Sequence, residues 1–187
     1  CSFFDSIPTI HLTGQVNQRE GRRVVGANVR QAGFQETQIV DMVKPITKYA
    51  VEVTSGDELK AELTKAYNIA ISGRMGPVLI DVPMDVQQEE VGDVVDYVDP
   101  VKPVIDRSEK YRIVESLNEF FSGSERPVIL FGAGIRLSGS EQYFENWLRG
   151  QTIPFVSSWN GSRYFDHDLP NYYGSIGVYG NRGANFV

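Results

Sequence analysis

In the first half of the chain, hydrophobic positions form short runs typical of strands in some segments and recur at helical spacing in another. Residues 9–14 and 49–53 are short apolar runs of the length typical of strands, and residues 78–83 are apolar at nearly every position. Between the last two runs, apolar side chains recur at helical spacing at Leu59, Leu63, Ala66 and Ala70. A run that is apolar on both faces is typical of a central parallel strand. We therefore predict that residues 78–83 lie in the middle of a parallel sheet.

The ends of the helix in this half carry recognisable signals. Ser55 and Glu58 form a capping box, in which each side chain accepts a hydrogen bond from a free N–H of the first turn. Gly73 is the predicted residue just past the last turn, where glycine tolerates a left-handed conformation. A shorter helix is predicted over residues 35–43, and residues 18–33 are polar and glycine-punctuated, which indicates a loop.

The second half repeats the same alternation. The predicted elements are a helix capped by Asp106 or Ser108 and ended by Gly123, a strand over 127–131, a helix over 139–149 and a strand over 153–156. Strands that alternate with helices at this spacing predict parallel sheets flanked by helices, the α/β class with Rossmann-like or flavodoxin-like architecture.

A segment without helical period separates the two halves. Residues 91–103 contain two prolines and several acids, and proline restrains both its own backbone and the residue before it. We predict an extended linker over residues 93–104 between two partial domains, residues 1–92 and 105–187. Because the chain opens with Cys1 inside an apolar stretch, we expect it to be a segment of a longer protein.

Composition narrows the class of protein. The 187 residues are 41% hydrophobic and 22% charged with a net charge of −6, which is ordinary for a globular protein and argues against a nucleic-acid partner. Since no apolar run approaches about 18 residues, no membrane span is expected. A single cysteine, Cys1, cannot form an internal disulfide, so a cytoplasmic location is predicted.

Catalytic signals of the familiar kinds are weak in this sequence. Metal binding needs three or four convergent ligands, and the residues 166–168 (Asp-His-Asp) are expected to form a solvated loop, so no metal site is predicted. The two histidines do not support a Ser-His-Asp arrangement, and Cys1 has no evident base beside it.

Glycine-rich turns after two predicted strands are a stronger signal. Gly132-Ala133-Gly134 and residues 157–161 both follow strands, and ligands of α/β sheets bind beyond the carboxyl ends of strands. The two turns are therefore expected to face one crevice that suits a nucleotide-like ligand. The alternative is a plain strand-to-helix turn, because Leu137 stands where a dinucleotide fingerprint has its third glycine.

Two sites in the first half allow a functional or a structural interpretation. Phe34 and Gln35 follow a loop and either contact a ligand or serve as a core ring and a first-turn helix residue. Arg74 is either a cation at a helix C-terminus or a contact to a phosphate or flavin.

Several blocks, in order along almost the whole chain, make it resemble the acetolactate synthase branch of the thiamine diphosphate-dependent enzymes. The blocks are Asp5-Ser6-Ile7-Pro8, Thr13-Gly14-Gln15-Val16, Phe34-Gln35-Glu36, Pro45-Ile46-Thr47-Lys48, residues 72–87, residues 173–180 and Ala184-Asn185-Phe186. The run over residues 72–87 is the most specific of these.

The resemblance implies a fold, a chemistry and a set of site residues. Residues 1–92 would be the C-terminal half of the pyrimidine-binding domain and residues 105–187 the first half of the central domain. Phe34 and Gln35 match residues that line the substrate channel near the thiazolium ring. The residues that match contacts to FAD are Arg74, Gly132, Ala133, Gly134, Ser158, Trp159, Gly177, Val178 and Tyr179.

The implied enzyme uses thiamine diphosphate and Mg²⁺, held mostly by residues outside this chain, with FAD as a further cofactor. It would decarboxylate a 2-oxo acid such as pyruvate and transfer the two-carbon unit, as in branched-chain amino acid biosynthesis. A homodimer or homotetramer, with a regulatory subunit as a further partner, is implied. The catalytic glutamate and the metal-binding motif of the family are not in this chain, so the chain alone is expected to be inactive.

Departures from the family pattern keep two alternatives open. Met84 stands where a lysine is usual, Tyr179 where a histidine is common, and Trp159-Asn160 replace a smaller apolar pair. The first alternative is a flavin-free thiamine diphosphate decarboxylase, acyltransferase or carboligase. The second is a noncatalytic α/β nucleotide-binding module.

Overall fold

The computed structural model describes residues 1–21, 26, 29–92, 106–162 and 168–187. The chain divides into two compact units, Cys1–Pro103 and Val104–Val187. The predicted linker over residues 93–104 lies outside the described residues, as do Asp166 and His167. No helix among the described residues is long and apolar enough to cross a bilayer.

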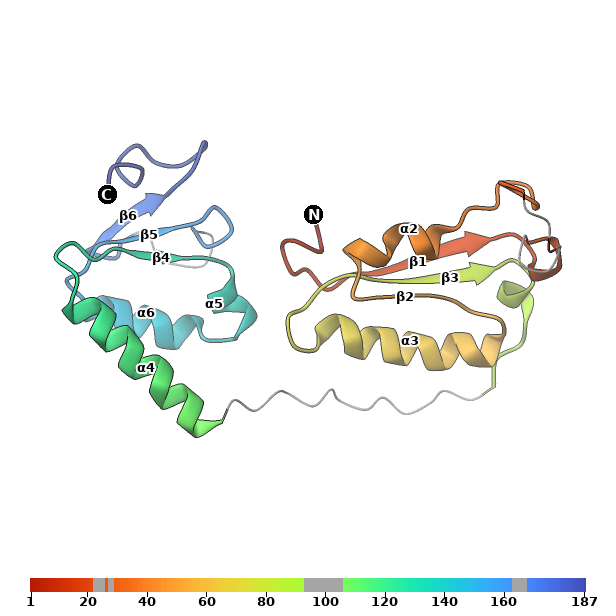
Figure 1. Cartoon of the computed structure of the whole chain (residues 1–187), viewed down its shortest axis with the longest axis horizontal. Helices are drawn as coiled ribbons and strands as arrows, with labels where there is room; N and C mark the ends of the chain where they lie inside the picture. Colours follow the sequence, from red (N-terminus) through yellow and green to blue (C-terminus); the bar gives the residue numbers. More distant parts are fainter. Residues whose placement is uncertain (22–25, 27–28, 93–105, 163–167) are drawn as a thin grey trace. The chain divides into compact units, whose positions relative to one another are not determined.

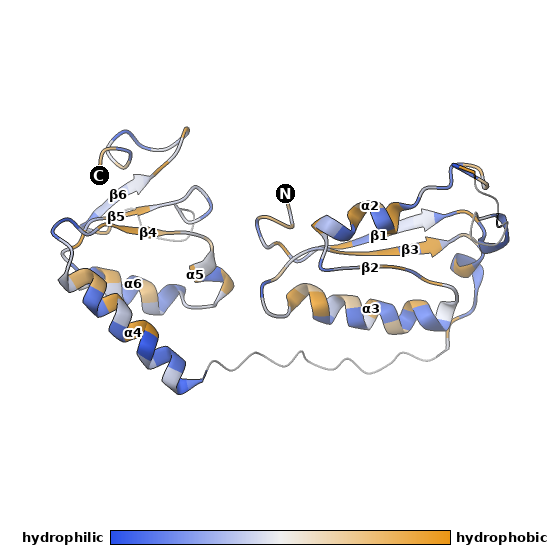
Figure 2. Cartoon of the chain, in the orientation of Figure 1, coloured by the Kyte–Doolittle hydropathy of each residue, from blue (hydrophilic) through white to orange (hydrophobic). Residues whose placement is uncertain are grey.

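Unit 1 is a three-stranded parallel sheet between helices (Figure 1). The strands lie in the order β1 (Ile10–Gln15), β3 (Val78–Pro83) and β2 (Tyr49–Glu52), and both pairings are parallel. Helices α2 (Ile39–Val43) and α3 (Gly56–Ile71) lie on opposite sides of the sheet in Figure 1. Every residue of β3 is buried, which confirms the predicted central strand, and Figure 2 shows β3 coloured as hydrophobic.

The predicted limits of α3 are confirmed at one end and need a correction at the other. Gly73 has a φ of +53° just past the C-cap residue Ser72, as predicted. At the start, Ser55 Oγ accepts a hydrogen bond from the Glu58 N–H at 3.2 Å. The reciprocal half of the capping box is wrong, because the Glu58 carboxylate accepts at 2.6 Å from the backbone N–H of Thr54 rather than of Ser55.

Helix α2 begins at Ile39, four residues later than predicted. The reason is the turn before it, in which Gln35 has a φ of +63° and the Glu36 N–H donates to the Gly33 carbonyl at 3.2 Å. A left-handed residue cannot continue a right-handed helix, so Phe34 and Gln35 belong to a loop and not to a first helical turn.

Unit 2 is a second parallel sheet, in the order β4 (Ile129–Phe131), β5 (Phe155–Ser157) and β6 (Tyr172–Ser175). The helices are α4 (Arg107–Ser122), α5 (Gly134–Leu137) and α6 (Glu141–Arg149). The buried core comprises Phe131, Leu148, Phe155 and Leu169, and the partly buried side chains of Ile129, Ile135, Phe144 and Tyr172 pack against it. The predicted helices and strands are confirmed with shifted ends, whereas α5 and β6 were not predicted.

Helix α4 differs from the other long helix in its burial. None of its residues is buried, although its apolar positions recur at helical spacing and stand out in Figure 2. The exposed apolar side chains on it are Tyr111, Ile113, Val114, Leu117 and Phe120.

Candidate functional site

Phe34 and Gln35 lie in the loop over residues 32–38, at the carboxyl end of the unit 1 sheet. This placement follows from Gln15, the last residue of β1, whose Nε2 donates to the Thr37 carbonyl at 2.7 Å. The Phe34 ring is 85% exposed, which excludes the core interpretation offered by the sequence. The ring therefore lies at the surface beyond the carboxyl ends of the strands, and its contact with a ligand stays a prediction.

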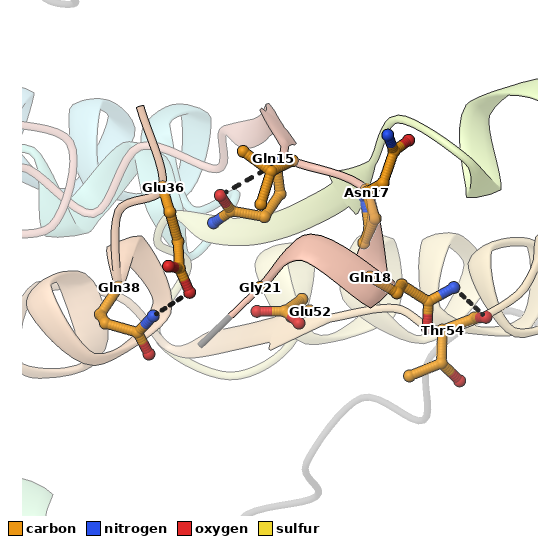
Figure 3. Close-up of a pocket in the computed structure, with 10 residues that line it drawn as sticks. Gln15, Asn17, Gln18, Gly21, Glu36, Gln38, Glu52 and Thr54 are labelled. Carbon is orange, nitrogen blue, oxygen red and sulfur yellow. Dashed lines mark hydrogen bonds between the residues drawn. The ribbon is translucent and has the colours of Figure 1, made fainter. Parts of the chain in front are cut away.

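A pocket of about 170 Å³ opens at the same end of the sheet (Figure 3). It is lined by the ends of all three strands together with the following loops, through Gln15, Val16, Asn17, Gln18, Gly21, Glu36, Gln38, Glu52, Thr54 and Pro83. In Figure 3 the Gln38 amide points to Glu36, and the Gln18 amide to the Thr54 carbonyl.

The chemistry of this pocket limits what it can hold. Its volume is below the several hundred Å³ of a typical cofactor pocket, so only a small polar group fits. Two carboxylates, Glu36 and Glu52, are among the lining residues, and they disfavour an anion. Phe34 and Gln35 are not among the lining residues, so the pocket by itself is not the predicted substrate channel.

Behind the pocket lies a buried carboxylate that sequence reasoning missed. Asp81, in the middle of β3, is 0% exposed. Its two oxygens accept from Thr13 Oγ1 at 2.7 Å and from Gln15 Nε2 at 2.9 Å. The sequence did offer a signal, a single acid within an otherwise apolar strand. A buried acid needs hydrogen-bond partners, so this acid predicts polar side chains on a neighbouring strand.

Arg74 lies at the other end of the unit 1 sheet, in the turn before β3. Its Nε donates to Ser6 Oγ at 2.9 Å, and Ser6 is itself buried with a φ of +56°. The structure therefore does not bring Arg74 together with Phe34 and Gln35.

Lys48 holds the backbone next to Arg74. Its ammonium donates to the carbonyls of Ile69 and Ser72 at the C-terminus of α3, the latter at 2.7 Å. Burial lowers the pKa of Lys48. A Cβ on Gly76 would lie 3.1 Å from Lys48 Cδ, so a glycine at this position leaves room for the lysine stem.

In unit 2 the glycine turns meet at the carboxyl ends of the strands. The Ser158 N–H donates to the Phe131 carbonyl at 2.8 Å, and a Cβ on Gly132 would lie 3.3 Å from Ser158 Oγ. A Cβ on Gly161 would lie 2.9 Å from the Phe131 carbonyl oxygen. The turns after β4 and β5 thus pack backbone against backbone, while the crevice that the sequence predicted between them stays a prediction.

A third loop, after β6, joins these two turns. The rings of Trp159 and Tyr179 meet edge to face with their centroids 5.2 Å apart. Gly177 has a φ of +107°, and its N–H donates to Asn185 Oδ1 at 2.9 Å. Trp159, Val178 and Tyr179 are all exposed, so this edge presents apolar and aromatic surface to solvent.

The space beside the glycine turn suits the approach of a ligand. Ala133 is the N-cap of α5, and Gly134 begins the helix with no heavy atom within 4 Å of where its Cβ would be. A flat ring can stack on the exposed aromatic pair, and a polar chain can run along the open backbone. Among the described residues no group of three or more His, Cys, Asp or Glu is placed to hold a metal ion.

Comparison with known proteins bears on both units. Residues 114–187 match the family model described as thiamine pyrophosphate enzyme, central domain. All of the chain is similar to a probable acetolactate synthase large subunit of Methanocaldococcus jannaschii (31% identical, covering 31% of that protein) and to the acetolactate synthase large subunit of Lactococcus lactis (34% identical, covering 31%). It is likewise similar to the acetolactate synthase isozyme 2 large subunit of Escherichia coli (28% identical, covering 32%). The chain spans about a third of the length of these relatives.

Proposed function

The chain belongs to the acetolactate synthase-like thiamine pyrophosphate enzymes, and on this premise we propose that it is part of an enzyme that decarboxylates a 2-oxo acid such as pyruvate and transfers the two-carbon unit to an acceptor. The observation that carries the proposal is the similarity of the whole chain to acetolactate synthase large subunits. Residues 1–92 would supply the C-terminal half of a pyrimidine-binding domain and residues 105–187 the first half of the central domain.

Within that enzyme the residues of this chain would form one wall of the active site. Thiamine diphosphate, when bound, supplies the electron sink for decarboxylation and carbon transfer. Phe34 would contact the substrate through its exposed ring, and Gln35 through its side-chain amide. The backbone of Gln35 is left-handed and forms part of the turn that holds both residues in the loop. Mg²⁺ and the catalytic glutamate would be contributed from outside the 187 residues, so the chain alone should be inactive.

An assay of the full-length enzyme tests this assignment. With pyruvate, thiamine diphosphate and Mg²⁺, we expect acetolactate to form. Phe34→Ala and Gln35→Ala should lower kcat/KM about 10- to 100-fold, because small displacements near reacting atoms are costly. Phe4→Ala is the matched control, since Phe4 is also an exposed phenylalanine of unit 1 but has no proposed role. Absence of thiamine-dependent pyruvate consumption would contradict the proposal.

FAD is proposed as a second cofactor, held in unit 2 by the three loops at the carboxyl ends of the strands. The fit is supported by the open backbone at Gly134 and the exposed rings of Trp159 and Tyr179. Gly132, Ala133, Ser158, Gly177 and Val178 complete the proposed contacts.

Optical measurements separate a flavin enzyme from a flavin-free relative. Flavin bands near ~450 nm that survive desalting, and quenching of Trp159 fluorescence by added FAD, are expected. Trp147→Phe should preserve the quenching and Trp159→Phe should remove it, because Trp147 lies in α6 and stacks on Phe144 instead. No bands and no uptake of FAD would favour the flavin-free decarboxylases, acyltransferases and carboligases.

The proposed assembly is a homodimer or homotetramer, with a regulatory subunit as a further partner. Light scattering of the purified full-length enzyme should give a mass of two or four subunits. A monomer with full activity would contradict this part of the proposal.

A further inference from the structure

Asp81 occupies a position where an apolar side chain would be expected to fit better. The five other residues of β3 are apolar and buried, and Asp81 itself is 0% exposed. Burial of a carboxylate without a cation is costly unless its oxygens are hydrogen-bonded. Both oxygens are, and both donors come from β1, through Thr13 and Gln15 on one face of the sheet. The carboxylate therefore serves to fix side chains of β1.

Gln15 carries this fixation beyond the sheet. One amide nitrogen, Nε2, donates at 2.9 Å to Asp81 Oδ2 and at 2.7 Å to the Thr37 carbonyl. The other end of the same amide is held as well, since Gln15 Oε1 accepts from the Val16 N–H at 3.1 Å. With all three contacts satisfied, the side chain has little freedom to rotate. Thr37 is two residues from Gln35 and three from Phe34.

The loop over residues 32–38 is closed internally by the Glu36 carboxylate and contacts the end of β1. The Glu36 carboxylate accepts from the N–H groups of Ala32 and Gly33, at 2.9 and 3.3 Å, and so closes the turn around Phe34. A Cβ on Gly33 would lie 2.8 Å from a methyl carbon of Val16, so the turn rests against the residue after β1. Gln15 Nε2 bonds both the Thr37 carbonyl and Asp81, so it links this turn to the buried carboxylate.

We propose that Gln15, held by Asp81, is a positioning residue that sets the place of the loop over residues 32–38, and with it Phe34 and Gln35, at the carboxyl end of the unit 1 sheet. The effect on catalysis rests on the function proposed above for Phe34 and Gln35. The proposed attachment of the loop through Gln15 stands independently of that function, on the hydrogen bonds of Gln15 to Asp81 and to the Thr37 carbonyl.

Two variants of the full-length enzyme separate positioning from stability. Gln15→Met keeps the length of the side chain and removes both donated hydrogen bonds. Thr13→Val is the matched control, because it removes the other hydrogen bond of Asp81 and leaves the link to Thr37 in place. Both should lower the melting temperature, but Gln15→Met alone should speed hydrogen exchange of the Ala32, Gly33 and Glu36 amides, about 10-fold. It alone should lower kcat/KM, by about 10- to 100-fold.

A double variant tests the direction of the hydrogen bonds. Asp81→Asn with Gln15→Glu exchanges donor and acceptor, so the two side chains can bond again while the Thr37 carbonyl loses its donor. This variant should recover the melting temperature relative to Gln15→Glu, yet it should keep the fast exchange and the low kcat/KM of Gln15→Met.

The outcomes test the attachment of the loop and its effect on catalysis separately. If Gln15→Met matches Thr13→Val in exchange of the loop amides, the attachment is wrong. If the loop amides exchange faster but kcat/KM is unchanged, the role in positioning Phe34 and Gln35 is wrong. A protein without any 2-oxo acid activity would overturn the proposed function, while the exchange measurement would still decide the attachment.

Discussion

Replacement of Gly161 by alanine is expected to destabilise unit 2 through a collision with backbone atoms. The added Cβ would lie 2.9 Å from the Phe131 carbonyl oxygen and 3.1 Å from Gly132 Cα, and neither atom belongs to a flexible side chain. Overpacking of this kind costs about 2–3 kcal/mol. For a unit of this size, spanning Val104–Val187, such a loss lowers Tm by about 10–20 °C.

Unfolding of unit 2 can be followed by itself, because both tryptophans of the chain, Trp147 and Trp159, lie in it. Urea unfolding monitored by tryptophan fluorescence should show the loss for Gly161→Ala. Gly134→Ala is the matched control in a neighbouring turn, where nothing lies within 4 Å of the new Cβ, and it should be neutral or stabilising by up to about 1 kcal/mol. Equal midpoints for the two variants would refute the argument that the turns after β4 and β5 pack backbone to backbone.

Three further predictions concern stability. Hydrogen bonds from Thr54 hold the pKa of Glu58 below its usual value, so this stabilisation is present near neutral pH and is lost as the pH falls below about 4.5 and through the lowered pKa. Glu58→Gln should cost about 1 kcal/mol at pH 7 and flatten the acid limb of the stability curve, measured by circular dichroism in urea; an unchanged limb would contradict this. Gly73→Ala should cost about 1–2 kcal/mol in the same assay, because its φ is +53°, and a neutral result would exclude that conformation. Phe155→Ala should cost about 3–5 kcal/mol by tryptophan fluorescence, since the ring is fully buried, and a loss under 1 kcal/mol would contradict the described core.

The elements that the sequence predicted are those whose signal is local. The burial of residues 78–83 and the face of α3 follow from hydrophobic period, and Gly73 follows from a rule about helix ends. Strand β6 was not predicted because Gly174 and two tyrosines interrupt any apolar run. Helix α5 was not predicted because four residues are too few to show a helical period of apolar positions.

In the candidate site, too, features with a local sequence signal were predicted and features that depend on distant residues were not. The contact between the turns at Gly132 and Ser158 could be predicted from the sequence, because parallel strands end at a common edge, whereas the crevice expected there stays a prediction. It did not predict the link between Gln15 and Asp81, because the two residues are 66 positions apart and their pairing depends on strand register. The turn that excludes Gln35 from α2 was also missed, since a left-handed backbone at a glutamine has no sequence signature.

The strand order of the two sheets implies an order of events during folding. In unit 2 each strand pairs with the next strand along the chain, so the pairings of Ile129 with Phe155 and of Phe155 with Tyr172 close shorter segments of chain. In unit 1, β1 pairs with β3, which brings Ile10 to Val78 past the whole of β2 and α3. Closing the longer loop costs about 1 kcal/mol more in chain entropy, and distant pairing slows folding. We expect unit 2 to fold first and β1 to join its sheet last, so the contact between Gln15 and the loop that carries Phe34 would be among the last to form.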